Sequence, residues 1–243
     1  MSDPLAPLLE LAEVADALEQ ARAAVDRTLW HKRLRRDGAA VATEVSLRCA
    51  VSSAALDGAE YRLDEVRGGA VTDSVVQGAL RVGGELPSLV ELWPKAPRQV
   101  LAKLHLLAAR DLAPEEQLGR PDSDPAKTER LDALCALVTA ESKLPAALVA
   151  AVVHGELLAL RPFPHGGGVV ARAAARLTLA ARGLDPHLLI AIDSGHANRA
   201  PEYAGASATF ATGTPDGLRS WLKHYGQALS HGCEVTTEIC NGH

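Results

Sequence analysis

Residues 161–172 combine charged side chains with three consecutive glycines, at positions 166–168. They join two apolar runs of helical character, 146–160 and 169–182. A glycine-rich turn that begins a helix leaves backbone N–H groups without partners at the positive end of the helix dipole. This arrangement favours the binding of an anion, above all a phosphate.

Three charged or titratable side chains in this stretch determine which chemistry it can support. Arg161 and Arg172 stay protonated at any physiological pH, so they can hold an anion but cannot accept a proton. His165 is the titratable base of the turn, and in a pocket it could deprotonate a hydroxyl or ligate a transition metal. His165 is therefore a candidate catalytic residue. The expected ligand contacts are Arg161, Gly166, Gly167, Gly168 and Arg172.

The same stretch resembles the signature of the Fic (Fido) family, His-Pro-Phe-x-Asp/Glu-Gly-Asn-Gly-Arg-x-x-Arg. The matching positions are Pro162, Phe163, Gly166, Gly168 and Arg172. Four positions differ: Arg161 stands for the catalytic His, His165 for the acidic metal ligand, Gly167 for the Asn and Val169 for the first Arg. The resemblance thus implies a phosphate cleft whose groups for AMP transfer have been replaced.

The replaced groups matter because AMP transfer in that family needs a base and a metal anchor. A guanidinium at Arg161 cannot take the proton of a target hydroxyl, and loss of a general base costs about 10²–10⁴-fold in rate. The imidazole of His165 is a poor ligand for Mg²⁺, which prefers oxygen. Val169 removes a cation that contacts phosphate. We therefore expect no ordinary AMP transfer.

A second motif ends the helical run that we expect from Ala40 to about Leu56. Residues Ser53 to Gly58 resemble the inhibitory-helix motif Ser/Thr-x-x-x-Glu-Gly/Asn of many Fic proteins, with Asp57 in place of Glu. In the family this acid pairs with the second Arg of the signature and denies it to the nucleotide γ-phosphate. The resemblance implies an ion pair between Asp57 and Arg172. Alternatively, Asp57 and Gly58 merely end the helix.

Two further regions are expected from the resemblance. Active relatives have a β-hairpin flap in the region of residues 111–127, but here only Gly119-Arg120 echoes it and no alternating pattern is present. We expect a short or absent flap. His154 matches a histidine of the helix before the signature, and its apolar neighbours favour a buried imidazole bonded to the backbone over a catalytic role. In the amphipathic helix expected from Ala96 to Arg110, His105 is expected at the surface or half-buried.

Composition excludes several classes of protein. The 243 residues carry a net charge of −5 without a dense basic face, which disfavours nucleic acid and anionic membranes as partners. No apolar stretch approaches about 18–20 residues, so no transmembrane helix is expected, and the first residues lack a secretory pattern. The four cysteines indicate reduced thiols and a cytoplasmic location.

Nearly every periodic segment has helical spacing, so we expect an all-α fold, a Fic-like bundle around a central helix–loop–helix. The expected regions are an N-terminal helical region carrying the inhibitory-like helix (1–90), a Fic-like core (91–230) and a C-terminal tail (231–243). Glycines at 68–69 and 78 should interrupt a helix, 82–88 should be a loop, and 193–200 should be turn-like. A short helix or an extended stretch is expected at 188–192.

The tail brings together residue types that zinc accepts. They are His231, Cys233, Cys240 and His243. Their spacing fits no strong zinc pattern, so we expect no metal site there.

These observations lead to one principal hypothesis and two alternatives. The principal one is a cytoplasmic, bacterial-type Fic-fold pseudoenzyme that binds an unknown protein partner or a small phosphate ligand in the old cleft. The first alternative is an active nucleotidyl- or phosphate-group transferase that uses non-standard residues such as His165. The second is a structural subunit without a ligand. No cofactor is expected; ATP and Mg²⁺ enter only if activity is retained. Oligomerisation is left open.

Overall fold

The computed structural model describes residues 3–242, and within that range all regular structure is helical, which confirms the predicted all-α fold. Met1, Ser2 and His243 lie outside the described residues; His243 was the fourth zinc-capable residue of the tail. The helices are η1 (Ala6–Glu10), α1 (Val14–Leu29), α2 (Lys32–Leu56), α3 (Leu63–Arg67), α4 (Ser74–Leu89), α5 (Pro97–Ala109), η2 (Glu115–Gln117), α6 (Pro125–Thr139), α7 (Ala146–Leu160), α8 (Gly167–Ala181), α9 (Ile192–Ala197), α10 (Ala200–Phe210) and α11 (Pro215–Asn241).

Helices α7 and α8 form the centre of the molecule and pack against each other. Their sequences are apolar on nearly every side, which is typical of helices covered by protein all round. In α7 the residues from Ala147 to Gly155 are all buried, and in α8 those from Val169 to Ala180 are buried. The loop that joins the two helices is therefore held rigidly at both ends.

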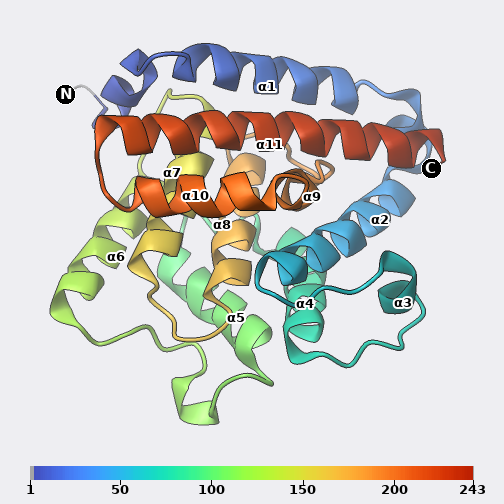
Figure 1. Cartoon of the computed structure of the whole chain (residues 1–243), viewed down its shortest axis with the longest axis horizontal. Helices are drawn as coiled ribbons and strands as arrows, with labels where there is room; N and C mark the ends of the chain where they lie inside the picture. Colours follow the sequence, from blue (N-terminus) through green and yellow to red (C-terminus); the bar gives the residue numbers. More distant parts are fainter. Residues whose placement is uncertain (1–2, 243) are drawn as a thin grey trace.

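Two layers cover this central pair. On one side α1 and α11 run next to each other, with α10 beneath them (Figure 1). The indole Nε1–H of Trp221 in α11 donates to the carbonyl of Ala151 in α7 at 2.8 Å, which ties this layer to the core. On the other side α4 and α5 pack on α8, and α2 reaches across to α9, α4 and α8. The C-terminal end of α2 thereby lies beside the start of α8.

The predicted break at Gly78 and the predicted loop at 82–88 are both wrong, because α4 runs through them. The carboxylate of Asp73 caps the helix by accepting from the N–H groups of Val75 and Val76. A Cβ at Gly78 would lie 2.2 Å from the carbonyl oxygen of Ala108 in α5. This glycine is therefore a contact point between two helices, and Pro87 is accommodated in the last turn. The predicted interruption at 68–69 is confirmed by the end of α3.

Other predicted boundaries also shift. The polar segment 193–200 was expected to be turn-like, but most of it forms α9. A segment without regular structure at 188–191 precedes α9 and includes Leu188 at a φ of +55°. Residues 231–241 continue α11 instead of forming a separate element. The helix expected to begin near Ala40 is joined to residues 32–36 across a kink at Asp37, whose backbone is not helical (φ −149°, ψ +41°), so the expected start corresponds to this kink.

Helix α2 is the one helix in residues 3–242 whose length and composition alone would allow it to cross a membrane. A kink interrupts it at Asp37, and its buried positions, which include Val45 and Cys49, pack against the rest of the bundle. A core helix of a folded domain passes the same length and composition test.

Candidate functional site

A cleft of about 760 Å³ lies between the end of α2, the α7–α8 loop and α10. Apolar side chains of α7 and α10 form much of its wall. The residues that supply charge, a hydroxyl or backbone N–H groups to it are Asp57, Arg161, Gly167, Gly168, Arg172, Tyr203 and Ser207. Four of the five predicted ligand contacts thus line one cleft; Gly166 lies immediately before it as the N-cap of α8.

The α7–α8 loop owes its shape to two residues in left-handed backbone conformation. Arg161 ends α7 with φ +46° and ψ +61°, and its N–H donates to the carbonyl of Leu157. Gly166 begins α8 at a φ of +65°, a conformation that glycine adopts without strain. Between them, the buried ring of Phe163 stacks on His105, with centroids 4.2 Å apart. His105 is fully buried, so its predicted surface or half-buried position is wrong.

Arg172 is the most extensively bonded side chain of the cleft, and it is only 1 % exposed. Its Nε–H donates to the hydroxyl of Ser53 at 2.7 Å, and its Nη2 donates to the Ser53 carbonyl at 2.8 Å. Nη2 also donates to a carboxylate oxygen of Asp57 at 2.8 Å. Nη1 donates to the hydroxyl of Tyr203 at 3.2 Å. The predicted contact between Asp57 and Arg172 is therefore present.

Charge balance keeps Arg172 ionised despite its burial. Burial alone would lower the pKa of its guanidinium, but interactions with Tyr203, Asp57 and Asp193 outweigh this effect and raise it. The Tyr203 hydroxyl stays neutral, because burial raises its pKa more strongly than Arg172 lowers it. The cleft thus contains a permanent buried cation whose main counter-ion, Asp57, has a side chain that is 24 % exposed.

Asp57 also lies against the first turn of α8. A Cβ placed on Gly168 would be 2.2 Å from one of its carboxylate oxygens, so only glycine leaves room for it. The carboxylate therefore lies where the N-terminal N–H groups of α8 favour negative charge. As the C-cap of α2, Asp57 ends that helix as well, so both roles considered from the sequence coexist.

The structure does not bring His165 into this arrangement. Its side chain is exposed and is not among the residues that line the cleft. Arg161 is exposed at the rim, where it also borders a neighbouring hollow that contains Arg120 and Lys127. Neither Arg161 nor His165 therefore places a proton acceptor in the cleft beside Arg172.

The region expected to hold a flap is a loop with one short turn, η2, and no strand between residues 111 and 124. Two hydrogen bonds fasten it, one to the α7–α8 loop and one to His105 in α5. The N–H of Asp122 donates to the carbonyl of Pro162 at 2.7 Å, and the N–H of Gly119 donates to Nδ1 of His105 at 3.0 Å. His105 therefore braces both loops at once.

A buried aromatic and imidazole cluster lies behind Arg172 and was not predicted from the sequence. His154, as expected, is buried, but Nε2 is bonded to the Tyr203 hydroxyl at 3.0 Å and not to the backbone. His196 and His224 are bonded to each other, Nδ1 to Nε2, at 3.0 Å. The ring of Trp221 packs against all three imidazoles. Four separate helices, α7, α9, α10 and α11, supply these groups, so no local sequence motif predicts the cluster.

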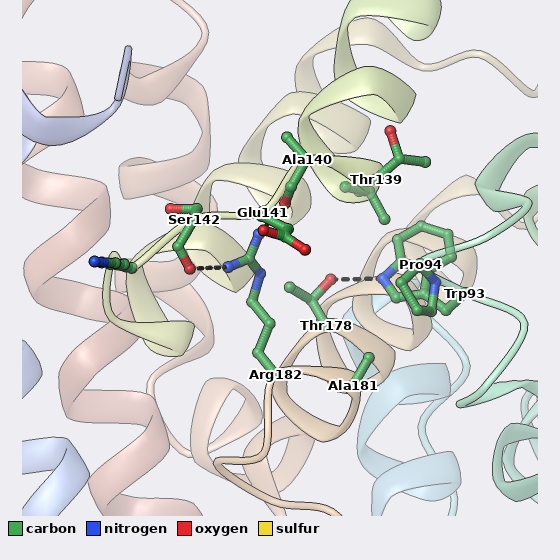
Figure 2. A pocket seen from close by; sticks show the side chains of 11 residues that line it. Trp93, Pro94, Thr139, Ala140, Glu141, Ser142, Thr178, Ala181 and Arg182 are labelled. Carbon is green, nitrogen blue, oxygen red and sulfur yellow. Dashed lines mark hydrogen bonds between the residues drawn. The ribbon is translucent and has the colours of Figure 1, made fainter. Parts of the chain in front are cut away.

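A second hollow, of about 570 Å³, lies on another face of α8 (Figure 2). There the indole N–H of Trp93 donates to the hydroxyl of Thr178 at 3.0 Å. The guanidinium of Arg182 points at the loop after α6 and donates to the carbonyl of Ser142 at 3.4 Å. These groups satisfy one another, and this hollow shares no residue with the cleft.

Within residues 3–242 no set of three or more His, Cys, Asp or Glu side chains is arranged to hold a metal ion. In the tail, the Nδ1–H of His231 donates to the carboxylate of Glu234 at 2.8 Å, while Cys233 and Cys240 are buried thiols. Burial raises the pKa of Cys49 and Cys233 to about 12, which keeps both thiols protonated.

Comparison with known proteins gives a consistent result at the level of structure. Neither a family model nor a curated protein sequence matches the chain. Fic-1 (residues 134–508) from C. elegans superposes with a TM-score of 0.75 at 17 % identity, covering 97 % of this chain and 75 % of that one. A Fic family protein from Desulfovibrio desulfuricans G20 gives a TM-score of 0.67 at 19 % identity, covering 98 % and 76 %.

A Fic domain containing signalling protein from Bacteroides thetaiotaomicron VPI-5482 gives a TM-score of 0.68 at 13 % identity, covering 93 % of this chain and 98 % of that one. The chain adopts a Fic fold. At these identities the likeness concerns the fold, so what this Fic-fold cleft can do follows from its own residues.

Proposed function

We propose that this Fic-fold protein does not carry out ordinary AMP transfer and instead binds a phosphate-containing ligand, or a partner that presents one, in the cleft of Arg172. The observation that carries the proposal is the composition of that cleft. It joins a buried cation and the first turn of α8, both suited to anions, and its one carboxylate, Asp57, is already paired with that cation.

The same composition argues against transfer chemistry. A base must lie within hydrogen-bonding reach of the hydroxyl it activates, and the cleft lining contains no imidazole. Arg161 stands at the loop position of the family's base and cannot accept a proton. Mg²⁺ is held by oxygen ligands, and Asp57 would have to leave Arg172 to serve as one. Binding without turnover is what these groups support.

The first test measures binding directly. Titration calorimetry with ATP and with pyrophosphate, each with and without Mg²⁺, should give binding that does not require the metal. Asp57→Ala should strengthen pyrophosphate binding about tenfold, because the ligand no longer competes with the carboxylate for Arg172 and α8. Asp64→Ala, which removes an exposed carboxylate, is the matched control and should leave the affinity unchanged.

Arg172→Ala in the Asp57→Ala protein should abolish the gain. If pyrophosphate binds none of these variants, the proposal is wrong and the cleft is structural. The transferase alternative predicts a different result. Incubation with labelled ATP and a cell lysate would then label a protein target, and His165→Ala would remove the label.

A further inference from the structure

The guanidinium of Arg172 is held from two directions, and the two sets of contacts come from different helices. The Nε and Nη2 groups donate to Ser53 and Asp57, which both belong to the end of α2. The Nη1 group donates to the hydroxyl of Tyr203, which belongs to α10. The Tyr203 contact is therefore independent of how α2 is placed.

The Tyr203 hydroxyl is itself held by His154, and the direction of the hydrogen bonds follows from chemistry. A guanidinium only donates, so the Tyr203 oxygen accepts from Nη1 of Arg172. The single proton of the hydroxyl needs an acceptor, and Nε2 of His154, 3.0 Å away, is placed to be that acceptor. His154 is thus neutral, with its proton on Nδ1, and the order of donation runs from Arg172 through Tyr203 to His154.

Burial supports this assignment. His154 is 0 % exposed, and burial together with the nearby charge of Arg172 lowers the pKa of its imidazole well below the usual range. A charged His154 would also need to donate from Nε2, which would leave the Tyr203 proton without an acceptor. This one protonation state satisfies the hydrogen bonds that link Arg172, Tyr203 and His154, and it leaves the Nδ1–H of His154 without a hydrogen-bond partner among the described residues.

We propose that His154 and Tyr203 are positioning residues that hold the Arg172 guanidinium at the floor of the cleft when Asp57 is withdrawn from it. Tyr203 lines the cleft beside Arg172, whereas His154 acts one residue further back, through Tyr203. The part of this proposal that concerns ligand affinity rests on the proposed function. The fixing of Arg172 itself is a property of the unliganded chain.

The test uses the full chain with Asp57→Ala as the parent, since Asp57 no longer contributes there. The first readout is exchange with water of the Arg172 guanidinium hydrogens, followed by ¹⁵N NMR and assigned by their loss in Arg172→Lys. Tyr203→Phe keeps the ring and removes the hydroxyl, and it should speed this exchange about tenfold or more. Tyr225→Phe is the matched control, because the hydroxyl of that buried tyrosine has no hydrogen-bond partner among the described residues.

His154 is tested with a pair of variants. His154→Gln retains an acceptor for the Tyr203 proton, whereas His154→Leu does not, so only the leucine variant should approach the exchange rate of Tyr203→Phe. Thermal unfolding of each variant establishes that it is folded at the temperature of the measurement. Equal exchange rates in Tyr203→Phe, Tyr225→Phe and the parent would overturn the proposal.

Pyrophosphate affinity is the second readout, and it separates the two proposals. If both hold, Tyr203→Phe and His154→Leu should weaken binding by the parent about tenfold, with His154→Gln and Tyr225→Phe close to the parent. If no variant binds pyrophosphate while the exchange rates change as expected, the positioning role stands and the proposed function fails. If binding persists with unchanged exchange rates, the positioning role fails alone.

Discussion

At the scale of single residues, the pair of Asp57 and Arg172 governs both stability and access to the cleft. Removing Asp57 leaves a buried cation whose remaining hydrogen-bond partners, Ser53 and Tyr203, are neutral. Asp57→Ala should therefore lower the free energy of unfolding by about 1–3 kcal/mol, less than the roughly 3–5 kcal/mol of a fully buried pair because Asp57 is partly exposed. Urea unfolding measures this loss. Asp64→Ala should have a much smaller effect, since its partner Arg67 is exposed as well.

Two neighbouring glycines at the start of α8 give a matched test of the same contact. A Cβ on Gly167 meets nothing within 4 Å, whereas a Cβ on Gly168 would lie 2.2 Å from a carboxylate oxygen of Asp57. Gly167→Ala should be neutral or stabilise by up to about 1 kcal/mol through helix propensity. Gly168→Ala should push Asp57 away from Arg172 and cost about 1–3 kcal/mol. Urea unfolding measures the change in the free energy of unfolding for both variants. Equal changes would show that the Asp57 carboxylate is not confined against the first turn of α8.

At the scale of elements, the end of α11 holds the irregular segment before α9 in place. The hydroxyl of Thr236 accepts from the buried N–H of Ala191 at 3.1 Å and lies 2.9 Å from the carbonyls of both Leu189 and Gly232. Thr236→Val keeps the shape but leaves the N–H of Ala191 unpaired and removes the donor beside the Leu189 carbonyl, so it should cost about 2 kcal/mol. Thr237→Val is the control, because the hydroxyl of Thr237 bonds only within its own helix. Equal losses of unfolding free energy in the two variants would contradict this role.

The same scale shows how far the sequence could lead. The contact of Asp57 with Arg172 was predictable because each residue belongs to a motif whose spacing is local. The course of α4 was not, because Gly78 favours a helix only through its approach to α5, which is a tertiary contact. The places of His196 and His224 behind Arg172 were not predictable either, since α9 and α11 bring them to His154 across long stretches of chain.

At the scale of the whole molecule, the fold buries three imidazoles in one place. Burial is the main cause that lowers the pKa of His154 and His196 well below the usual range, and it lowers the pKa of His224 to about 4. The charge of Arg199 lowers the pKa of His224 further, and the charge of Glu202 raises it. The folded chain therefore keeps all three neutral at a pH where an unfolded chain, with histidine pKa values near about 6.5, already binds protons.

The sign of the resulting pH dependence follows directly. Between about pH 6.5 and pH 4 the unfolded state binds more protons than the folded state, so stability falls as the pH falls through that window. Each imidazole contributes at most about 1.4 kcal/mol per pH unit. Asp185 and Asp193 oppose this trend near the low end, because burial raises their pKa values and the folded state then takes up protons too.

Urea unfolding at about pH 7.5 and about pH 5.5 should accordingly show a loss on the order of 3–4 kcal/mol in the native chain. His224→Gln removes one of the three clustered imidazoles and should reduce that loss by up to about a third, because burial also lowers the pKa of His105 outside the cluster, whatever the variant does to stability at the higher pH. His165→Gln replaces an exposed imidazole and should leave the loss unchanged. The difference between the two pH values isolates proton binding from packing, because a packing defect lowers both values equally. A loss that is the same in all three proteins would mean that the buried cluster takes up protons without unfolding.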